Sequence, residues 1–322
     1  MLKKTALSLA LLSATATANA DVLTTVKPLG FIANAITDGV TETKVLLPMS
    51  ASPHDYNLKP SDVEQLQSAQ LVVWVGDEME TFLEKSIDKL PKEKVLTLAD
   101  VNAIEELVEA SKKDDHDHDD HHHEHKHDHK HEHSHKHEHK HDHGHSHDHH
   151  DHDEDWHIWL SPVASEQIAE QIAERLSAQL PEQKAKIEAN LADFKAALAK
   201  KNGEITQQLA AVKDKGYYTF HDAYGHFEDA YGLKSLGSFT INPTIAPGAK
   251  TLNAIKKNIS KNKAQCLFAE PQFTPKVIES LSKGTSAKVG KLDPLGEKVA
   301  MGKDAYPQFL QSIANQFSDC LK

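Results

Sequence analysis

The chain has 322 residues and a formal net charge of −12 at pH 7, with 24 histidines and only two cysteines. Residues 114–155 hold most of this charge, with fifteen acids against four lysines, and outside them and residues 1–20 there are 33 acids and 30 bases. No basic patch or stripe remains, which excludes nucleic acid as a partner, and the roughly 260 other residues are enough for two lobes.

The first twenty residues have the composition of a secretory signal peptide. Lys3 and Lys4 precede an apolar stretch over 5–15, and small residues surround the end at Ala20. The stretch is too short to span a membrane and no other segment approaches eighteen apolar residues, so we expect no membrane insertion. We predict cleavage after Ala20 and a mature chain free in a Gram-negative periplasm; an uncleaved N-terminal anchor is the alternative.

From residue 21, short β-rich runs alternate with helical patterns, which is typical of an α/β layer. The run 71–75 is almost continuously apolar, as in a parallel strand buried on both faces. We predict an N-terminal lobe over 21–163. Its predicted strands are 22–26, 44–47, 71–75 and 95–98, and its predicted helices are 29–36, one starting near Asp62 with Ser61 as its cap, and 79–90.

Between residues 114 and 155, 20 of the 24 histidines alternate with aspartate, glutamate and lysine. Such a segment has nothing to bury, so we predict a solvated, disordered loop. Imidazole is the commonest protein ligand for zinc and its neighbours, which predicts an accessory loop that binds several zinc ions weakly and collects or senses metal. A flexible insert with incidental affinity is the alternative. The histidines are His116, His118, His121, His122, His123, His125, His127, His129, His131, His133, His135, His137, His139, His141, His143, His145, His147, His149, His150 and His152.

Helical patterns resume after residue 156. Ser161 is the expected N-cap of a helix with Pro162 at its first position, and after Pro181 a second helical pattern continues for about thirty residues, or roughly 45 Å. We assign 164–212 to linking helices. Over 213–322 the alternation restarts as a C-terminal lobe, with strands predicted at 217–220, 236–241, 264–268 and 288–292 and helices at 249–259 and 309–321. The fold class is therefore α/β, with two lobes around one long helix.

Cys266 and Cys320 are the only cysteine pair in a chain that leaves the reducing cytosol, so we predict a disulfide. A thiolate metal pair is a weaker alternative, because neither cysteine belongs to a CxxC motif.

Only His54, His157, His221 and His226 lie outside the histidine-rich segment. The first three each lie near the end of an ordered element, and ligands of open α/β sheets collect outside the carboxyl ends of strands. We therefore expect His54, His157 and His221 to converge on one metal ion. His226 is a weaker candidate. It lies five residues after His221, a spacing that places the two side chains poorly on one face of a helix. Three neutral imidazoles with at most one carboxylate suit tetrahedral Zn²⁺, with nickel as an alternative.

Five motifs carry a resemblance to a known family. They are His54-Asp55-Tyr56, the run 156–162 (WHIWLSP), the run 220–225 (FHDAYG), the run 268–273 (FAEPQF) and the run 292–296 (LDPLG). Over essentially the whole mature chain, the sequence resembles the zinc-binding component of bacterial high-affinity zinc-uptake ABC transporters, in the metal-specific cluster of periplasmic binding proteins.

The resemblance implies two α/β lobes with a small, mostly parallel sheet each, joined by a rigid helix, and a metal site in the cleft between them. It also implies His54, His157 and His221 as zinc ligands and an inner-membrane zinc ABC permease as partner. Family members often have a glutamate before the first histidine, where Pro53 stands here. We expect water at the fourth position, with Asp293, which matches an aspartate of manganese-binding relatives, or a histidine of the loop as alternatives.

Several neighbours of these ligands are assigned supporting roles. Glu270 is a weaker candidate for the fourth position, because beside Pro271 it can cap the next helix. Asp55, Asp155 and Asp222 are candidates to accept a hydrogen bond from the far nitrogen of a ligand ring. Trp156 and Trp159 flank His157 and are expected to form core or cleft wall.

The predicted function is capture of Zn²⁺ by a monomeric, non-enzymatic solute-binding protein that delivers it to the permease. Two alternatives stay open. One is a zinc storage or buffering protein, in which the histidine-rich segment is the whole function. The other is a three-histidine zinc hydrolase, against which the chain has no HExxH motif.

Overall fold

The computed structural model describes residues 21–111, 154–240, 247–261, 263–271, 276–283 and 285–322. Within them the chain forms two four-stranded sheets whose paired strands all run parallel. The strands are β1 (Val22–Thr24), β2 (Thr43–Val45), β3 (Leu71–Trp74), β4 (Val95–Thr97), β5 (Tyr217–His221), β6 (Ser235–Thr240), β7 (Cys266–Ala269) and β8 (Lys288–Lys291). Both halves repeat one strand order, β2-β1-β3-β4 and β6-β5-β7-β8. The predicted α/β fold with two small parallel sheets is confirmed.

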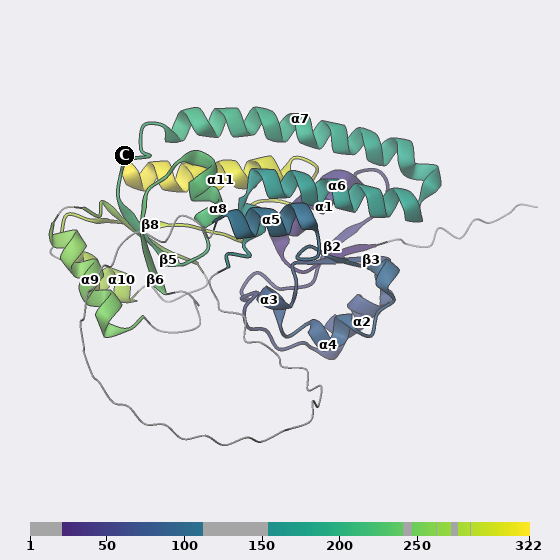
Figure 1. Ribbon diagram of the computed structural model, residues 1–322, viewed down its shortest axis with the longest axis horizontal. Coiled ribbons are helices and arrows are strands. Elements are labelled where there is room, and N and C mark those ends of the chain that lie inside the picture. The colour runs from purple at the N-terminus through teal and green to yellow at the C-terminus, as the bar shows by residue number, and fades with distance from the viewer. Residues whose placement is uncertain (1–20, 112–153, 241–246, 262, 272–275, 284) are drawn as a thin grey trace, which may run out of the picture.

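Helices cover both sheets (Figure 1). The apolar sequences of the inner strands require this cover, since every residue of β3 and β7 is buried. The helices are α1 (Lys27–Thr37), α2 (Pro60–Ser68), α3 (Asp77–Glu80), α4 (Glu84–Ile87), α5 (Asn102–Ser111), α6 (Pro162–Gln179), α7 (Lys184–Leu209), α8 (Gly225–Tyr231), α9 (Ala249–Ser260), α10 (Lys276–Ser282) and α11 (Ala305–Leu321).

The long helix α7 joins the two halves. It has 26 residues, about 39 Å at 1.5 Å per residue, and Figure 1 shows it running along one side of both halves above α6 and α11. One hydrophobic cluster contains Val22 of the first sheet, Phe194 of α7 and Phe268 of the second sheet. The halves therefore share a continuous core, and the predicted long helix is confirmed.

Three local predictions differ from the structure around the first sheet. Helix α2 begins at Pro60, so Lys59 and not Ser61 is its N-cap, and the Lys59 backbone N–H donates to Asp62 at 2.8 Å. The predicted helix 79–90 is instead the two single turns α3 and α4, because the chain bends after Glu80 and places Leu83 in the core. Helix α5 has no counterpart among the predicted elements.

The start of α6 follows its sequence. Ser161 is the N-cap, its hydroxyl oxygen accepts the Ala164 backbone N–H at 3.1 Å, and Pro162 stands at the first helical position. This predicted start is confirmed. The two residues before Ser161, Trp159 and Leu160, are fully buried in the core.

Cys266 and Cys320 form the predicted disulfide, which joins β7 to the end of α11 with 6.0 Å between the two Cα atoms. Gly290 of β8 makes room for it. A Cβ at this position would lie 2.8 Å from the Cys320 sulfur and 2.6 Å from the Phe268 ring, which is closer than van der Waals contact permits.

Within the described part of the chain, every helix is too short or too polar to cross a membrane. The predicted signal peptide, residues 1–20, lies outside the described residues.

Glu80, the last residue of α3, is buried, and its carboxylate accepts the backbone N–H of Val75, the residue after β3, at 2.8 Å. Burial raises the pKa of Glu80 from 4.5 to about 7, against the opposing effect of its hydrogen bonds. The unfolded chain then ionises at lower pH than the folded chain, so the free energy of unfolding falls as pH rises from about 4.5 to 7. The loss is about 3 kcal/mol.

We expect Glu80→Gln to remove this pH dependence of the free energy of unfolding. Urea unfolding at pH 4.5 and pH 8 measures it: the variant should gain about 3 kcal/mol relative to the parent chain between the two pH values. An unchanged difference between the chains would show that Glu80 titrates normally in the folded state.

Candidate metal centre

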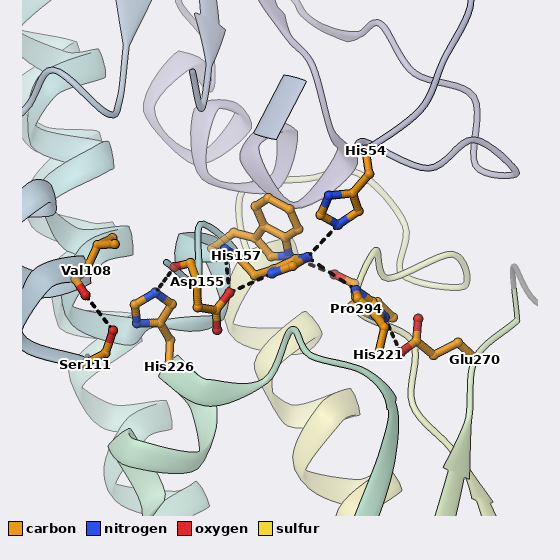
Figure 2. Close-up of polar contacts among 10 residues, drawn as sticks. His54, Val108, Ser111, Asp155, His157, His221, His226, Glu270 and Pro294 are labelled. Carbon is orange, nitrogen blue, oxygen red and sulfur yellow. Dashed lines mark hydrogen bonds and ion pairs between the residues drawn. The ribbon is translucent and has the colours of Figure 1, made fainter. Parts of the chain in front are cut away.

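Three histidines from distant segments meet at one point (Figure 2). His54 lies in the loop after β2, where its backbone N–H donates to the Ser52 hydroxyl at 3.2 Å. His157 directly precedes a short 3₁₀ turn, Ile158–Leu160, and His221 is the last residue of β5. The predicted convergence of these residues is therefore what the structure shows.

The three rings face one another through their Nε2 atoms. The Nε2 of His157 lies 3.1 Å from that of His54 and 3.3 Å from that of His221, and the potential ligand atoms of the trio all lie within 4.8 Å of one another. A tetrahedral zinc ion with Zn–N bonds of about 2.0–2.1 Å would hold its ligand nitrogens about 3.3–3.4 Å apart. The spacing is thus close to what zinc requires.

Two carboxylates, the half-buried Asp155 and the buried Glu270, orient two of the rings. Asp155 Oδ1 accepts from His157 Nδ1 at 2.6 Å and from the His157 backbone N–H at 3.0 Å, and Glu270 Oε1 accepts from His221 Nδ1 at 2.7 Å. Because an ionised carboxylate only accepts, each Nδ1 carries the proton and each Nε2 presents a lone pair to the centre.

The electrostatic environment keeps His54 in its metal-binding form. Burial, together with the neighbouring rings of His157 and His221, lowers the pKa of His54 from 6.5 to about 3, so His54 is neutral at physiological pH. Burial alone would raise the pKa of Asp155, but the charge of His157 and its hydrogen bonds outweigh burial and bring this pKa below its usual range.

The trio opens on a cavity of about 20 Å³ that is lined by both halves of the chain. This is close to the space of a single water molecule or ion. Trp159 forms one wall: it is fully buried, its ring meets the His157 ring edge-on, and its indole N–H donates to the Pro294 carbonyl at 2.9 Å. Trp156 is also buried, so both tryptophans are core and wall as predicted. The cavity is lined by Ala51, Ser52, Pro53, His54, His157, Trp159, His221, Glu270, Pro294 and Leu295.

Asp293 and His226 lie outside this trio. The Asp293 carboxylate accepts the backbone N–H groups of Leu295 and Glu297 at 3.2 and 2.6 Å. The ring of His226 bonds the Asp155 backbone carbonyl at 2.6 Å.

Of the three aspartates expected to support a ligand ring, Asp155 contacts His157. The partner of His221, Glu270, was not predicted in this role. The signal that could have identified it is its place directly after β7, beside the strand β5 that ends in His221. The predicted accessory loop, from His116 to His152, lies outside the described residues.

Known proteins of one family match nearly the whole chain. The family model of the periplasmic zinc-uptake complex component A matches residues 22–320. The high-affinity zinc uptake system protein ZnuA of Haemophilus ducreyi is 73% identical over 321 residues, covering 100% of this chain and 99% of that protein. The protein of the same name from Haemophilus influenzae is 58% identical, with 100% and 98% covered, and the one from Yersinia pestis is 45% identical, with 95% and 92% covered.

Solved structures share the fold. A crystal structure of ZnuA superimposes with a TM-score of 0.72 at 21% identity, covering 94% of this chain and 99% of that one. The periplasmic zinc-binding protein TroA of Treponema pallidum gives 0.71 at 18% identity, with 94% and 99% covered.

Proposed function

The chain belongs to the family of the periplasmic zinc-uptake complex component A, and from this premise we propose that it captures Zn²⁺ with His54, His157 and His221 in the cavity between its two halves. It then delivers the ion to an inner-membrane ABC permease. Zinc is the transported solute of this protein and not a catalytic cofactor. The chain is a solute-binding protein and not an enzyme, so the hypothesis of a three-histidine hydrolase is discarded.

One observation carries the assignment of the ligands. The Nδ1 atoms of His157 and His221 both donate to carboxylates, so their two Nε2 lone pairs face each other at 3.3 Å. Two acceptors at that distance repel each other unless a cation lies between them. Zn²⁺ with three imidazoles and a water at the fourth position satisfies this arrangement.

The charges near the site also favour a divalent cation. His54 is neutral, and the carboxylates of Asp155 and Glu270 each bond a ligand ring. Two negative charges offset the two positive charges of Zn²⁺, which makes its transfer from water into a buried site feasible.

We also propose how the remaining parts of the chain serve uptake. Residues 1–20 direct export and are removed, 21–163 and 213–322 form the two lobes around the linking helices 164–212, and the protein acts as a monomer. The histidine-rich segment 114–155 ends two residues before His157, so zinc that it binds weakly is held close to the cavity. Its alternating acids raise the local cation concentration.

Storage in that segment is the second candidate function, because 20 histidines could bind many more ions than the cavity. Titration calorimetry of the mature chain with and without residues 114–155, at pH 7.5 and 5.5, separates the two. We expect one tight zinc site in both chains at pH 7.5 and several weaker sites only in the intact chain. Protons compete at imidazole pKa values near 6.5, so we expect the weaker sites to empty at pH 5.5.

Loss of tight one-to-one binding on deletion would favour storage. A capacity that does not change between the two pH values would contradict the proposed role of the histidines in the segment.

A further inference from the structure

The first sheet ends in the edge strand β4. In the strand order β2-β1-β3-β4, this strand pairs with β3 alone among the described strands. The Leu98 N–H donates to the Trp74 carbonyl of β3 at 3.0 Å. Because backbone groups alternate in direction along a strand, the N–H and C=O of Thr97 point away from β3. Such an edge presents backbone donors and acceptors to which another extended chain can bind.

Helices cover both faces of the sheet beside this edge. On one face, Val95 packs against the hydrophobic cluster that contains Ile87 of α4. On the other face, Leu96 belongs to the cluster that contains Ile172 of α6, and Figure 1 shows α4 and α6 on opposite sides of β3. Both layers and all three residues of β4 line one open groove of about 830 Å³. Neighbouring strands lie about 4.7–4.9 Å apart, so the groove lies where a fifth strand would be added.

The charges of the groove favour a basic occupant. Four of the side chains that line it are carboxylates and two are cations, namely Asp77, Glu84, Asp88 and Asp100, with Lys92 and Arg175. Glu84 begins α4 and Asp88 is its C-cap, and both are exposed. Their spacing of four residues places the two carboxylates on the same side of the helix. The wall formed by α4 is therefore an acidic surface beside the open edge of β4.

The wall formed by α6 is polar instead. Gln167, Gln171 and Arg175 line the groove and are half-buried. They repeat every four residues, so they share one face of the helix over about 12 Å, the length of roughly four residues of strand. Glutamine amides both donate and accept hydrogen bonds, which suits uncharged polar side chains.

We propose that β4 is a docking edge for an extended segment of a partner protein, which pairs with Thr97 as a fifth strand and carries lysine or arginine at alternate positions. Side chains of a strand point alternately to its two faces. The basic ones then lie against Glu84 and Asp88, and the polar ones between them lie against the glutamines of α6. This groove shares no lining residue with the metal cavity, so the docking edge is separate from the zinc ligands.

Peptides test the pairing with β4. The ligand is a short fluorescent peptide of alternating threonine and lysine, and fluorescence anisotropy measures its binding to the full mature chain. Two further peptides carry backbone N-methyl groups, one on its inner threonines and the other on its inner lysines. Alternate N–H groups of a strand point to opposite sides, so only one of these two sets faces β4. We expect that peptide to bind about tenfold more weakly and the other to bind like the unmethylated one.

Equal affinities of the two methylated peptides would overturn the proposal, because attraction by charge alone does not distinguish them. The proposal is also wrong if the unmethylated peptide shows no saturable binding.

A pair of matched variants tests the acidic wall. Glu84→Gln/Asp88→Asn removes two charges from the groove, and Glu64→Gln/Asp193→Asn removes two charges from exposed residues that do not line it. At low salt we expect the first variant to bind the unmethylated peptide about fivefold more weakly, and the second to change its affinity by less than about twofold. Residues 114–155 are present in both chains, so their acids affect both measurements alike. Equal losses would show that the peptide responds only to net charge, and zinc titration checks that each variant is folded.

Discussion

Replacing His157 with alanine is expected to lower the affinity for zinc about a thousandfold. His157 is the central ligand, since its Nε2 faces both other Nε2 atoms, at 3.1 and 3.3 Å. Apparent zinc-binding free energies of about 10–16 kcal/mol, shared over four ligand positions, correspond to roughly 2.5–4 kcal/mol for each. A loss of about 4 kcal/mol is a factor of about a thousand in the dissociation constant.

Competition with a chelator of known zinc affinity measures this change, with residues 114–155 deleted from both chains so that only the cavity is titrated. His226→Ala is the control, because His226 is the other described histidine, is also buried, and lies outside the trio. We expect this control to lose less than about tenfold, through its bond to the Asp155 carbonyl.

The same variants connect binding with uptake. In a strain that depends on this chain for zinc, import at limiting zinc should be lost with His157→Ala and retained with His226→Ala. An affinity of His157→Ala within tenfold of the parent would show that the trio is not the tight site.

The second large effect is expected from the disulfide. Cys266 and Cys320 are 54 residues apart, and in the chain-entropy model closing a loop of that length stabilises the folded state by about 4 kcal/mol. The double variant Cys266→Ala/Cys320→Ala should lose this amount, with a melting temperature lower by roughly 8–16 °C.

Urea unfolding of the zinc-free chains provides the measurement, because bound zinc would add its own stabilisation. The parent chain unfolded in strong reductant is the control, since it keeps both side chains and loses only the cross-link. A loss below about 1 kcal/mol in both would mean that the disulfide contributes little.

Much of the fold could be predicted from the sequence because its causes are local. The apolar run of β3 is buried whatever lies beside it, Ser161-Pro162 caps α6 with its own atoms, and α7 follows a long helical pattern. The predictions that were wrong depend on distant contacts. Between α3 and α4 the chain turns so that Leu83 enters the core and Glu80 reaches the Val75 amide, and no periodicity in 79–90 indicates this.

The histidine-rich segment indicated the site indirectly. It contains 20 of 24 histidines, which left four elsewhere, and their places at the ends of ordered elements indicated which three would meet. The sequence pattern could not give the arrangement of these residues in space, because His157 is 103 residues from His54 and 64 from His221.

The sequence by itself determined the fold class and indicated a metal-binding chemistry with three candidate ligands, because residue types, spacing and apolar periodicity carry that information along the chain. Only the tertiary structure decided how each ring is held. Asp155 was one of three possible carboxylate partners, and Glu270 had been considered for a different role. Each hydrogen bond to a ring fixes a proton on Nδ1 and turns Nε2 to the centre. That depends on which atoms come within 3 Å of one another in the folded chain, and the order of the residues does not give these distances.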